Sequence, residues 1–290
     1  MAIKDSTELL EALDLEQIEK NIFKGYNHDV GAHHVFGGQV LSQALHAAQL
    51  TVPNDRYVHS MHGYFILPGD LKAPIIYIID EVRDGGSFTT RRVKAIQHGK
   101  DIFITALSFQ LVQDGFDHQI PMPAVDPPNE LLSDAELIAN FKDQLPNGAE
   151  RFFVTRPIEF RPLNPINFIA RRASEPIRNV WFKAKGHLPD DPVIHQRVLA
   201  YASDYNLLTT ALLPHQHEVN FKYLQMASID HAMWFHRPFR ADEWLLYALD
   251  SPSASGARGF NRGSIFKEDG TLVASVVQEG LLRQKQQIKS

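Results

Sequence analysis

Residues 38–50, GQVLSQALHAAQL, and residues 192–208, PVIHQRVLAYASDYNLL, decide the fold of this 290-residue chain. Both stretches carry apolar residues at helical spacing, which predicts a helix with a strongly apolar stripe. Each is followed by segments in which apolar and polar residues alternate, as is typical of antiparallel strands. A helix packed on one face of an antiparallel sheet buries both apolar faces. Each half of the chain is therefore predicted to be α+β, with an antiparallel sheet wrapped around a central helix.

The strands are predicted from alternation between glycine-containing turns. In the first half they cover residues 57–67, 74–82, 87–97 and 101–112, and in the second half residues 225–235, 243–250, 256–266 and 271–282. Gly99 and Gly270 fall in hairpin turns, where a positive φ is required. Asp191 is the expected N-cap of the second helix and Pro192 its first residue, and this helix is predicted to continue to Leu208.

The two halves match each other at an offset of about 158 to 170 residues, which indicates an internal duplication. The matched residues include Tyr64 with Trp234, Phe65 with Phe235, Ala106 with Ala274 and Gln110 with Gln278. Between the halves lies a proline-rich stretch that is typical of a connector. We therefore predict a first module at residues 1–112, a connector at 113–150 and a second module at 151–290. A surface excursion inside one domain stays open as the alternative.

The composition argues against several classes of protein. Lys and Arg number 29 against 34 Asp and Glu, and the net charge of −5 opposes a nucleic-acid or anionic-membrane partner. The chain has no cysteine, which excludes disulfides, thiolate zinc sites and cysteine nucleophiles. No apolar run reaches the roughly 18 residues that a spanning helix needs, and no secretory leader is recognisable. We expect a cytoplasmic protein without membrane insertion.

Two polar residues interrupt apolar faces. On the predicted helix, the carboxylate of Asp204 emerges among apolar residues three and four positions away, so it needs hydrogen-bond partners or a raised pKa. Gln278 ends the apolar face that Ala274 and Val276 share on the last strand. A buried amide can hold a water or polarise a carbonyl, although a purely structural role is open for both residues. Ser228 stands near the start of a strand with mixed alternation, and alone it is typical of a turn or edge.

Other constellations are weak or missing. The sequence contains no Gly-x-Ser-x-Gly, His-Glu-x-x-His or Gly-x-Gly-x-x-Gly motif and no Gly-x-x-x-x-Gly-Lys loop. Two histidine pairs, His59 with His62 and His215 with His217, lack a third ligand at a sensible spacing, so neither metal nor cofactor is expected. Four arginines lie at corresponding places in the two halves. They are interpreted either as part of solvated strand faces or as a basic site for a phosphate-bearing ligand. They are Arg91, Arg92, Arg258 and Arg262.

Several longer strings resemble one known family. They are VFGGQVLSQAL from Val35, YASDYNLL from Tyr201, IDHAMWFHRPF from Ile229 and LVASVVQEG from Leu272. They closely resemble the acyl-CoA thioesterase II (TesB-type) family, and the resemblance extends from about Leu10 to Leu282. It implies a double hotdog and hydrolysis of medium- to long-chain fatty acyl-CoA to free fatty acid and coenzyme A, without a cofactor.

The resemblance also implies a catalytic set that orients a water for attack on the thioester carbonyl. The set falls on Asp204, Ser228 and Gln278, and bacterial relatives often carry threonine at the serine position. His46 stands in the first half where the duplication places the counterpart of Asp204, so one site per chain is expected. In this hypothesis Asp204 is the general base, and a backbone N–H near Gly37 or Gly38 stabilises the oxyanion.

Two alternatives stay open at this point. One is a hotdog hydratase or dehydratase acting on acyl thioesters, with a histidine such as His59 as the base. The other is an acyl-CoA binding protein without catalysis. Curled sheets leave edges and apolar faces that commonly pair, so a homo-oligomer, a dimer or tetramer, is expected in either case.

Overall fold

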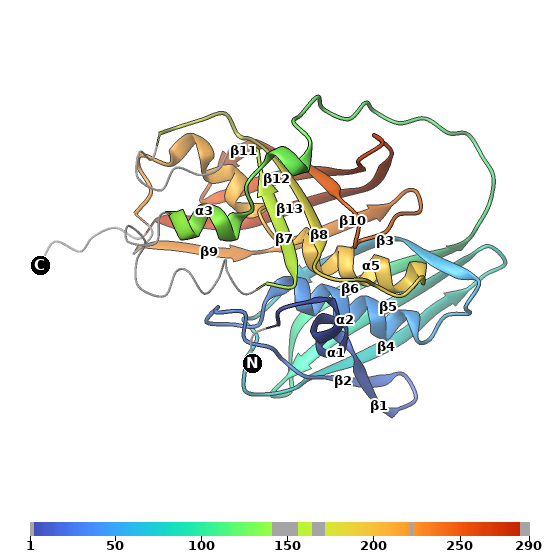
Figure 1. Cartoon of the computed structure of the whole chain (residues 1–290). Coiled ribbons are helices and arrows are strands. Elements are labelled where there is room, and N and C mark those ends of the chain that lie inside the picture. The colour runs from blue at the N-terminus through green and yellow to red at the C-terminus, as the bar shows by residue number, and fades with distance from the viewer. Residues whose placement is uncertain (1–2, 141–155, 164–171, 221–222, 285–290) are drawn as a thin grey trace, which may run out of the picture.

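One continuous antiparallel sheet carries both halves of the protein (Figure 1). The structure is a computed structural model that describes residues 3–140, 156–163, 172–220 and 223–284. In this described part the sheet has 13 strands, ordered β1-β2-β4-β5-β6-β3-β10-β13-β12-β11-β8-β7, with β9 paired to β13. The helices are α1 (Ser6–Leu13), α2 (Gly37–Gln49), α3 (Asp134–Asn140) and α5 (Pro192–Ser203), with 3-10 helices η1 (Pro128–Glu130) and η3 (Leu208–His215).

The strands of the first half are β1 (Leu15–Glu19), β2 (Ile22–Gly25), β3 (Arg56–Phe65), β4 (Ile75–Asp84), β5 (Phe88–Gln97) and β6 (Lys100–Leu111). Those of the second half are β7 (Ile158–Pro162), β8 (Ile177–Ala184), β9 (Leu224–Ser228), β10 (Asp230–Phe235), β11 (Leu245–Ser255), β12 (Arg258–Lys267) and β13 (Leu272–Gln284). The predicted meanders are thus present, and both Gly99 and Gly270 have positive φ in their turns. Alternation alone did not reveal β1, β2, β7 and β8, which lie toward the two ends of the sheet.

The two predicted sheets are joined into one where β3 pairs with β10. Residues 60–64 of β3 run antiparallel to residues 230–234 of β10, with Met61 opposite Met233. The central helices α2 and α5 lie side by side against this sheet (Figure 1). The Ser42 hydroxyl donates to the Arg197 carbonyl at 2.9 Å across the helix pair. Since the main apolar cluster spans both halves and includes residues of both helices, the two helices are held as a unit.

Two predicted boundaries in the second half are wrong. Helix α5 ends at Ser203 rather than Leu208, because Asp204 takes the C-cap position and Asn206 adopts a left-handed φ of 67°. The single strand predicted over residues 225–235 is divided after Ser228, and its two parts pair with different stretches of β13. Both breaks lie next to polar residues that the sequence singled out.

The chain after β6 packs on the outside of the second half. In Figure 1 this segment arcs from the end of β6 around the second half to η1. The Gln119 amide nitrogen donates to the Gly270 carbonyl at 2.8 Å, and its oxygen accepts from the Leu272 N–H at 3.0 Å. Further along this segment the short helix α3 is described up to Asn140. None of the described helices has the length and apolar character to cross a membrane.

Candidate active site

Asp204 lies where the C-terminal end of α5 meets the strands β9 and β13. Its Oδ1 accepts a hydrogen bond from the Gln278 Nε2 at 2.9 Å. The Ser228 hydroxyl acts on the same carboxylate as a side-chain donor that lowers its pKa. Ser228 ends β9 and pairs with Gly280, two residues after Gln278 on β13. The structure therefore brings the three predicted site residues together around one acid.

The predicted face of β13 explains how Gln278 reaches the interior. Val276, Gln278 and Gly280 are buried, while Ser275, Val277 and Glu279 between them are partly exposed. The alternation of a strand thus aims the Gln278 amide inward, as the sequence predicted.

The N-terminus of α2 closes the site from the first half of the chain. A Cβ added to Gly37 would lie only 2.6 Å from the Asp204 Oδ2, so the carboxylate rests directly against the glycine Cα. The Gly38 N–H acts on the same carboxylate as a backbone donor that lowers its pKa. The N-cap residue Phe36 supplies no side-chain hydrogen bond, so Asp204 caps α2 from the other half.

This neighbourhood bears on the predicted oxyanion hole, which stays a prediction. The Gly38 N–H acts on the Asp204 carboxylate and lowers its pKa, so this amide has a second role beside the one expected toward the substrate. The Gly37 N–H is the other candidate named from the sequence.

The electrostatic setting of Asp204 suits a general base. Burial raises the pKa of its carboxyl, while the hydrogen bonds from Gln278, Gly38 and Ser228 act in the opposite direction. The net effect is a pKa above the ordinary value, because the desolvation of the charged form outweighs the donors. A carboxylate with raised proton affinity removes a proton from water more readily.

His231 is a member of the site that the sequence analysis missed. Its Nδ1 lies 3.2 Å from the Gln278 Nε2, and its Nε2 lies 3.0 Å from the Ser203 Oγ. The ring is fully buried, and burial lowers its pKa to about 3. Along β10 it shares the buried face with Met233 and Phe235, and this alternation is the signal that was available.

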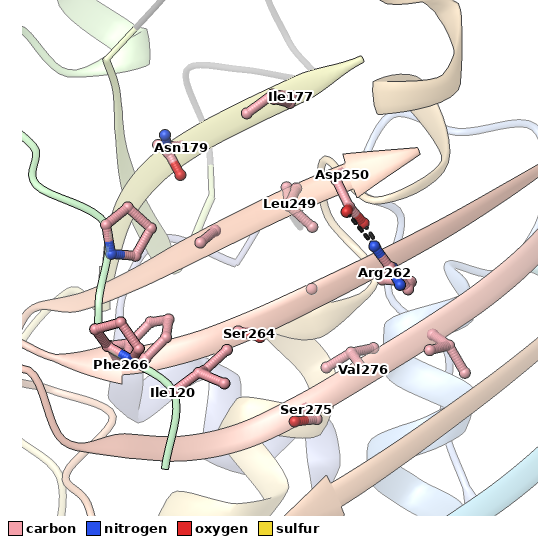
Figure 2. Close-up of a pocket in the computed structure, with 15 residues that line it drawn as sticks. Ile120, Ile177, Asn179, Leu249, Asp250, Arg262, Ser264, Phe266, Ser275 and Val276 are labelled. Atoms are coloured by element: carbon pink, nitrogen blue, oxygen red, sulfur yellow. Dashed lines mark hydrogen bonds and ion pairs between the residues drawn. The ribbon is translucent and has the colours of Figure 1, made fainter. Parts of the chain in front are cut away.

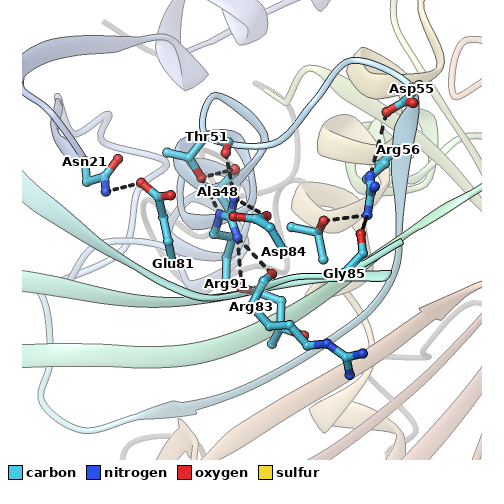
Figure 3. A network of polar contacts seen from close by, with 12 residues as sticks. Asn21, Ala48, Thr51, Asp55, Arg56, Glu81, Arg83, Asp84, Gly85 and Arg91 are labelled. Atoms are coloured by element: carbon cyan, nitrogen blue, oxygen red, sulfur yellow. Dashed lines mark hydrogen bonds and ion pairs between the residues drawn. The ribbon is translucent and has the colours of Figure 1, made fainter. Parts of the chain in front are cut away.

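The arginines proposed for a phosphate-bearing ligand have partners within the protein. Arg91 is 1% exposed and donates to the Thr51 carbonyl at 2.9 Å, just beyond the end of α2, and to Asp84 at 2.8 Å (Figure 3). It therefore stabilises the fold and is not available to a ligand. The others form ion pairs on the sheet: Arg92 with Asp80, Arg258 with Glu279 and Arg262 with Asp250.

The histidine pairs do not join the site. His59 is hydrogen-bonded to the Ser108 hydroxyl at 2.8 Å and packs against the ring of Phe88, whereas His62 contacts Trp234. In the described ranges no three His, Cys, Asp or Glu side chains gather as a metal site. His59 has no described contact with Asp204 or Gln278.

A hollow of about 650 Å³ lies elsewhere, on the outer side of the second half (Figure 2). Ile120 and the neighbouring prolines of the chain after β6 form one wall, and residues of β11, β12 and β13 form the floor. The Arg262–Asp250 ion pair stands at its edge in Figure 2. Its lining includes none of Asp204, Ser228 and Gln278, so it is separate from the Asp204 site.

Comparison with known proteins places this geometry in a family. A family model described as acyl-CoA thioesterase matches residues 149–281, and one described as acyl-CoA thioesterase N-terminal domain matches residues 26–110. Human acyl-coenzyme A thioesterase 8 is 44% identical over 287 residues, covering 95% of this chain and 89% of that protein. Acyl-CoA thioesterase 2 of Haemophilus influenzae is 42% identical over 279 residues, covering 95% and 96% of the two chains.

A solved structure agrees with these matches. The acyl-CoA thioesterase II of Mycobacterium marinum is 43% identical, with a TM-score of 0.78 over 95% of this chain and 98% of that chain. Together with the sheet topology, this likeness confirms the predicted α+β double hotdog. The chain belongs to the acyl-CoA thioesterase family.

Proposed function

We propose that the protein hydrolyses medium- to long-chain fatty acyl-CoA to free fatty acid and coenzyme A at the Asp204 site. The observation that carries the proposal is the 2.9 Å hydrogen bond between Asp204 and Gln278, with Ser228 on the same carboxylate. Family membership supplies the reaction class. No cofactor is required, since the proposed groups are the acid, the alcohol, the amide and a water.

In the proposed reaction Asp204 accepts a proton from a water while the water oxygen attacks the thioester carbonyl carbon. The Gln278 Oε1 is buried and has no partner among the described residues, so it is free to accept the second hydrogen of that water. Ser228 keeps the carboxylate oriented. The tetrahedral intermediate then expels the thiolate of coenzyme A, a good leaving group, and the carbonyl re-forms as the fatty acid.

The test is the release of free thiol by the purified protein across a series of acyl-CoA chain lengths. Asp204→Asn keeps the shape of the side chain and removes the base, so kcat should fall by about 100-fold or more with the fold unchanged. Asp250→Asn is the matched control, because this carboxylate pairs with Arg262 on the sheet and has no place in the mechanism. Parental turnover by Asp204→Asn would refute the proposal.

The same assay separates the two alternatives. A hydratase would change enoyl absorbance without releasing thiol, and a binding protein would retain acyl-CoA unchanged. The position of His59 against Ser108 and Phe88, rather than beside Asp204, favours the hydrolase.

The proposal includes the division of the chain into modules at residues 1–112 and 151–290 with a connector at 113–150. Two observations support it: the family models match residues 26–110 and 149–281 separately, and equivalent cross-strand pairs recur as Arg92–Asp80 and Arg262–Asp250. A cytoplasmic homo-oligomer also remains a proposal, supported by the absence of cysteine and by the sheet edges at β1 and β7.

A further inference from the structure

A buried chain of hydrogen bonds leads away from the proposed site and ends on the backbone of α5. It runs from Gln278 to His231, from His231 to Ser203, and from Ser203 to the Ala200 carbonyl. We propose that His231, held in one tautomer by Ser203, is a positioning residue that fixes the Gln278 amide with its oxygen turned toward the nucleophilic water. This inference rests on the proposed function and gives this chain of hydrogen bonds a role in it.

The direction of each bond follows from the far end. The Ser203 hydroxyl donates to the Ala200 carbonyl at 2.9 Å, so its oxygen is left to accept from the ring of His231 at 3.0 Å. The ring hydrogen therefore sits on Nε2. A neutral imidazole carries one such hydrogen, so Nδ1 is an acceptor. Among the described residues, the Gln278 amide nitrogen, 3.2 Å away, supplies the donor that Nδ1 requires.

The same amide nitrogen also donates to Asp204 at 2.9 Å, so both of its hydrogens are used. A flipped amide would place its oxygen against the bare Nδ1 and against the Asp204 carboxylate, two repulsive contacts in a buried setting. The observed orientation instead leaves the Gln278 Oε1 without a described partner and free for water.

His231 matters most at the moment of reaction. Once Asp204 has taken the proton from water, its carboxyl is neutral and holds the amide nitrogen less strongly than the carboxylate did. From then on, the Nδ1 of His231 is the acceptor that keeps the amide from turning. Because burial holds the pKa of His231 at about 3, the ring stays neutral and adds no charge beside Asp204.

The experiment compares three substitutions, two at His231 and one at Ser203, with one control. His231→Leu removes the acceptor, His231→Asn offers a carbonyl oxygen near the position of Nδ1, and Ser203→Ala releases the tautomer. We expect kcat to fall by about 10-fold to 100-fold in the leucine variant with KM within about twofold, and to recover in part in the asparagine variant. His236→Leu is the control, because its ring bonds to Ser275 at 2.9 Å outside the site, and it should keep the parental kcat.

A second readout is the ring ¹⁵N chemical shifts of His231 in the parent protein. A protonated Nε2 and a bare Nδ1 support the inference, and Ser203→Ala should produce a mixture of tautomers. A folded His231→Leu protein with parental kcat, or a protonated Nδ1 in the parent, overturns it. If the leucine variant does not fold, the tautomer of His231 measured in the parent protein decides whether the inference holds.

A failure of the proposed function can be told apart from a failure of this inference. Parental activity in Asp204→Asn removes the hydrolytic site itself. An inactive Asp204→Asn beside a fully active His231→Leu removes only the role of His231.

Discussion

Replacing Gly37 with alanine places a methyl group where the Asp204 carboxylate lies. The added Cβ would be 2.6 Å from the Asp204 Oδ2 and 3.1 Å from the Phe65 Cζ. Ordinary contact distances for carbon are about 3.5 Å, so the carboxylate must recede by roughly 0.5 to 1 Å. A misplacement of about 1 Å at a reacting group costs up to about 100-fold in rate, and we expect kcat to fall by about 10-fold to 100-fold.

The stability of Gly37→Ala should change much less than its activity. Alanine is favoured over glycine inside a helix by about 1 kcal/mol, and less at a first residue such as this one. This gain offsets part of the steric strain, so the midpoint of thermal unfolding should stay within about 4 °C of the parent. A loss of kcat without a matching loss of stability would locate the effect at the carboxylate.

The assay is thiol release under saturating acyl-CoA, with two comparisons. Gly115→Ala is the matched control, because a Cβ at that position meets no described heavy atom within 4 Å, and it should leave kcat unchanged. The double variant Gly37→Ala with Asp204→Asn should be no slower than Asp204→Asn alone, since the methyl group acts through the acid. Parental kcat in Gly37→Ala, or fully additive losses in the double variant, would refute this reasoning.

Three further predictions concern the site and its frame. Ser228→Ala should lower kcat, whereas Ser228→Thr should preserve it, because threonine keeps the hydroxyl and restricts its rotamer; both are read by thiol release. Activity should be lost as the pH falls through the raised pKa of Asp204, and in Ser228→Ala this limb of the pH–rate profile should move to higher pH because a donor that lowers the pKa is gone. Arg91→Met should lower the free energy of unfolding in urea by about 2 to 4 kcal/mol, since it strips buried carbonyls of their donor. By contrast, Arg92→Ala removes an exposed ion pair and should lower the free energy of unfolding by only about 0 to 1 kcal/mol.

The sequence predicted the fold and two of the site residues on physical grounds. Asp204 and Gln278 stand out because a polar group inside an apolar face requires a partner, and each is the partner of the other. Ser228 could not be found this way, because its strand breaks beside it and alternation loses its meaning there. His231 follows the buried face of β10 and was within reach of the same argument.

Contacts between the two halves were beyond pattern analysis. Nothing in the periodicity of residues 38–50 indicates that the start of this helix meets an acid more than 150 positions away. The end of α5 was likewise missed, because apolar spacing continues beyond Ser203 while the backbone turns at Asn206. Periodicity reports which face of an element is buried and not which element buries it.

The capping of the two central helices offers a reason for one site per chain. At the start of α5 the Asp191 side chain accepts from the Val193 N–H at 2.9 Å, so this terminus is satisfied within its own half. At the start of α2 Phe36 provides no such cap, and the Asp204 carboxylate lies against Gly37 and acts on the Gly38 N–H. The first half has no matching acid, because His46 lies within α2 and bonds to the Leu13 carbonyl. If the proposed mechanism holds, the duplicated frame is catalytic on one side only, where an uncapped helix in one half faces an acid at a helix end in the other.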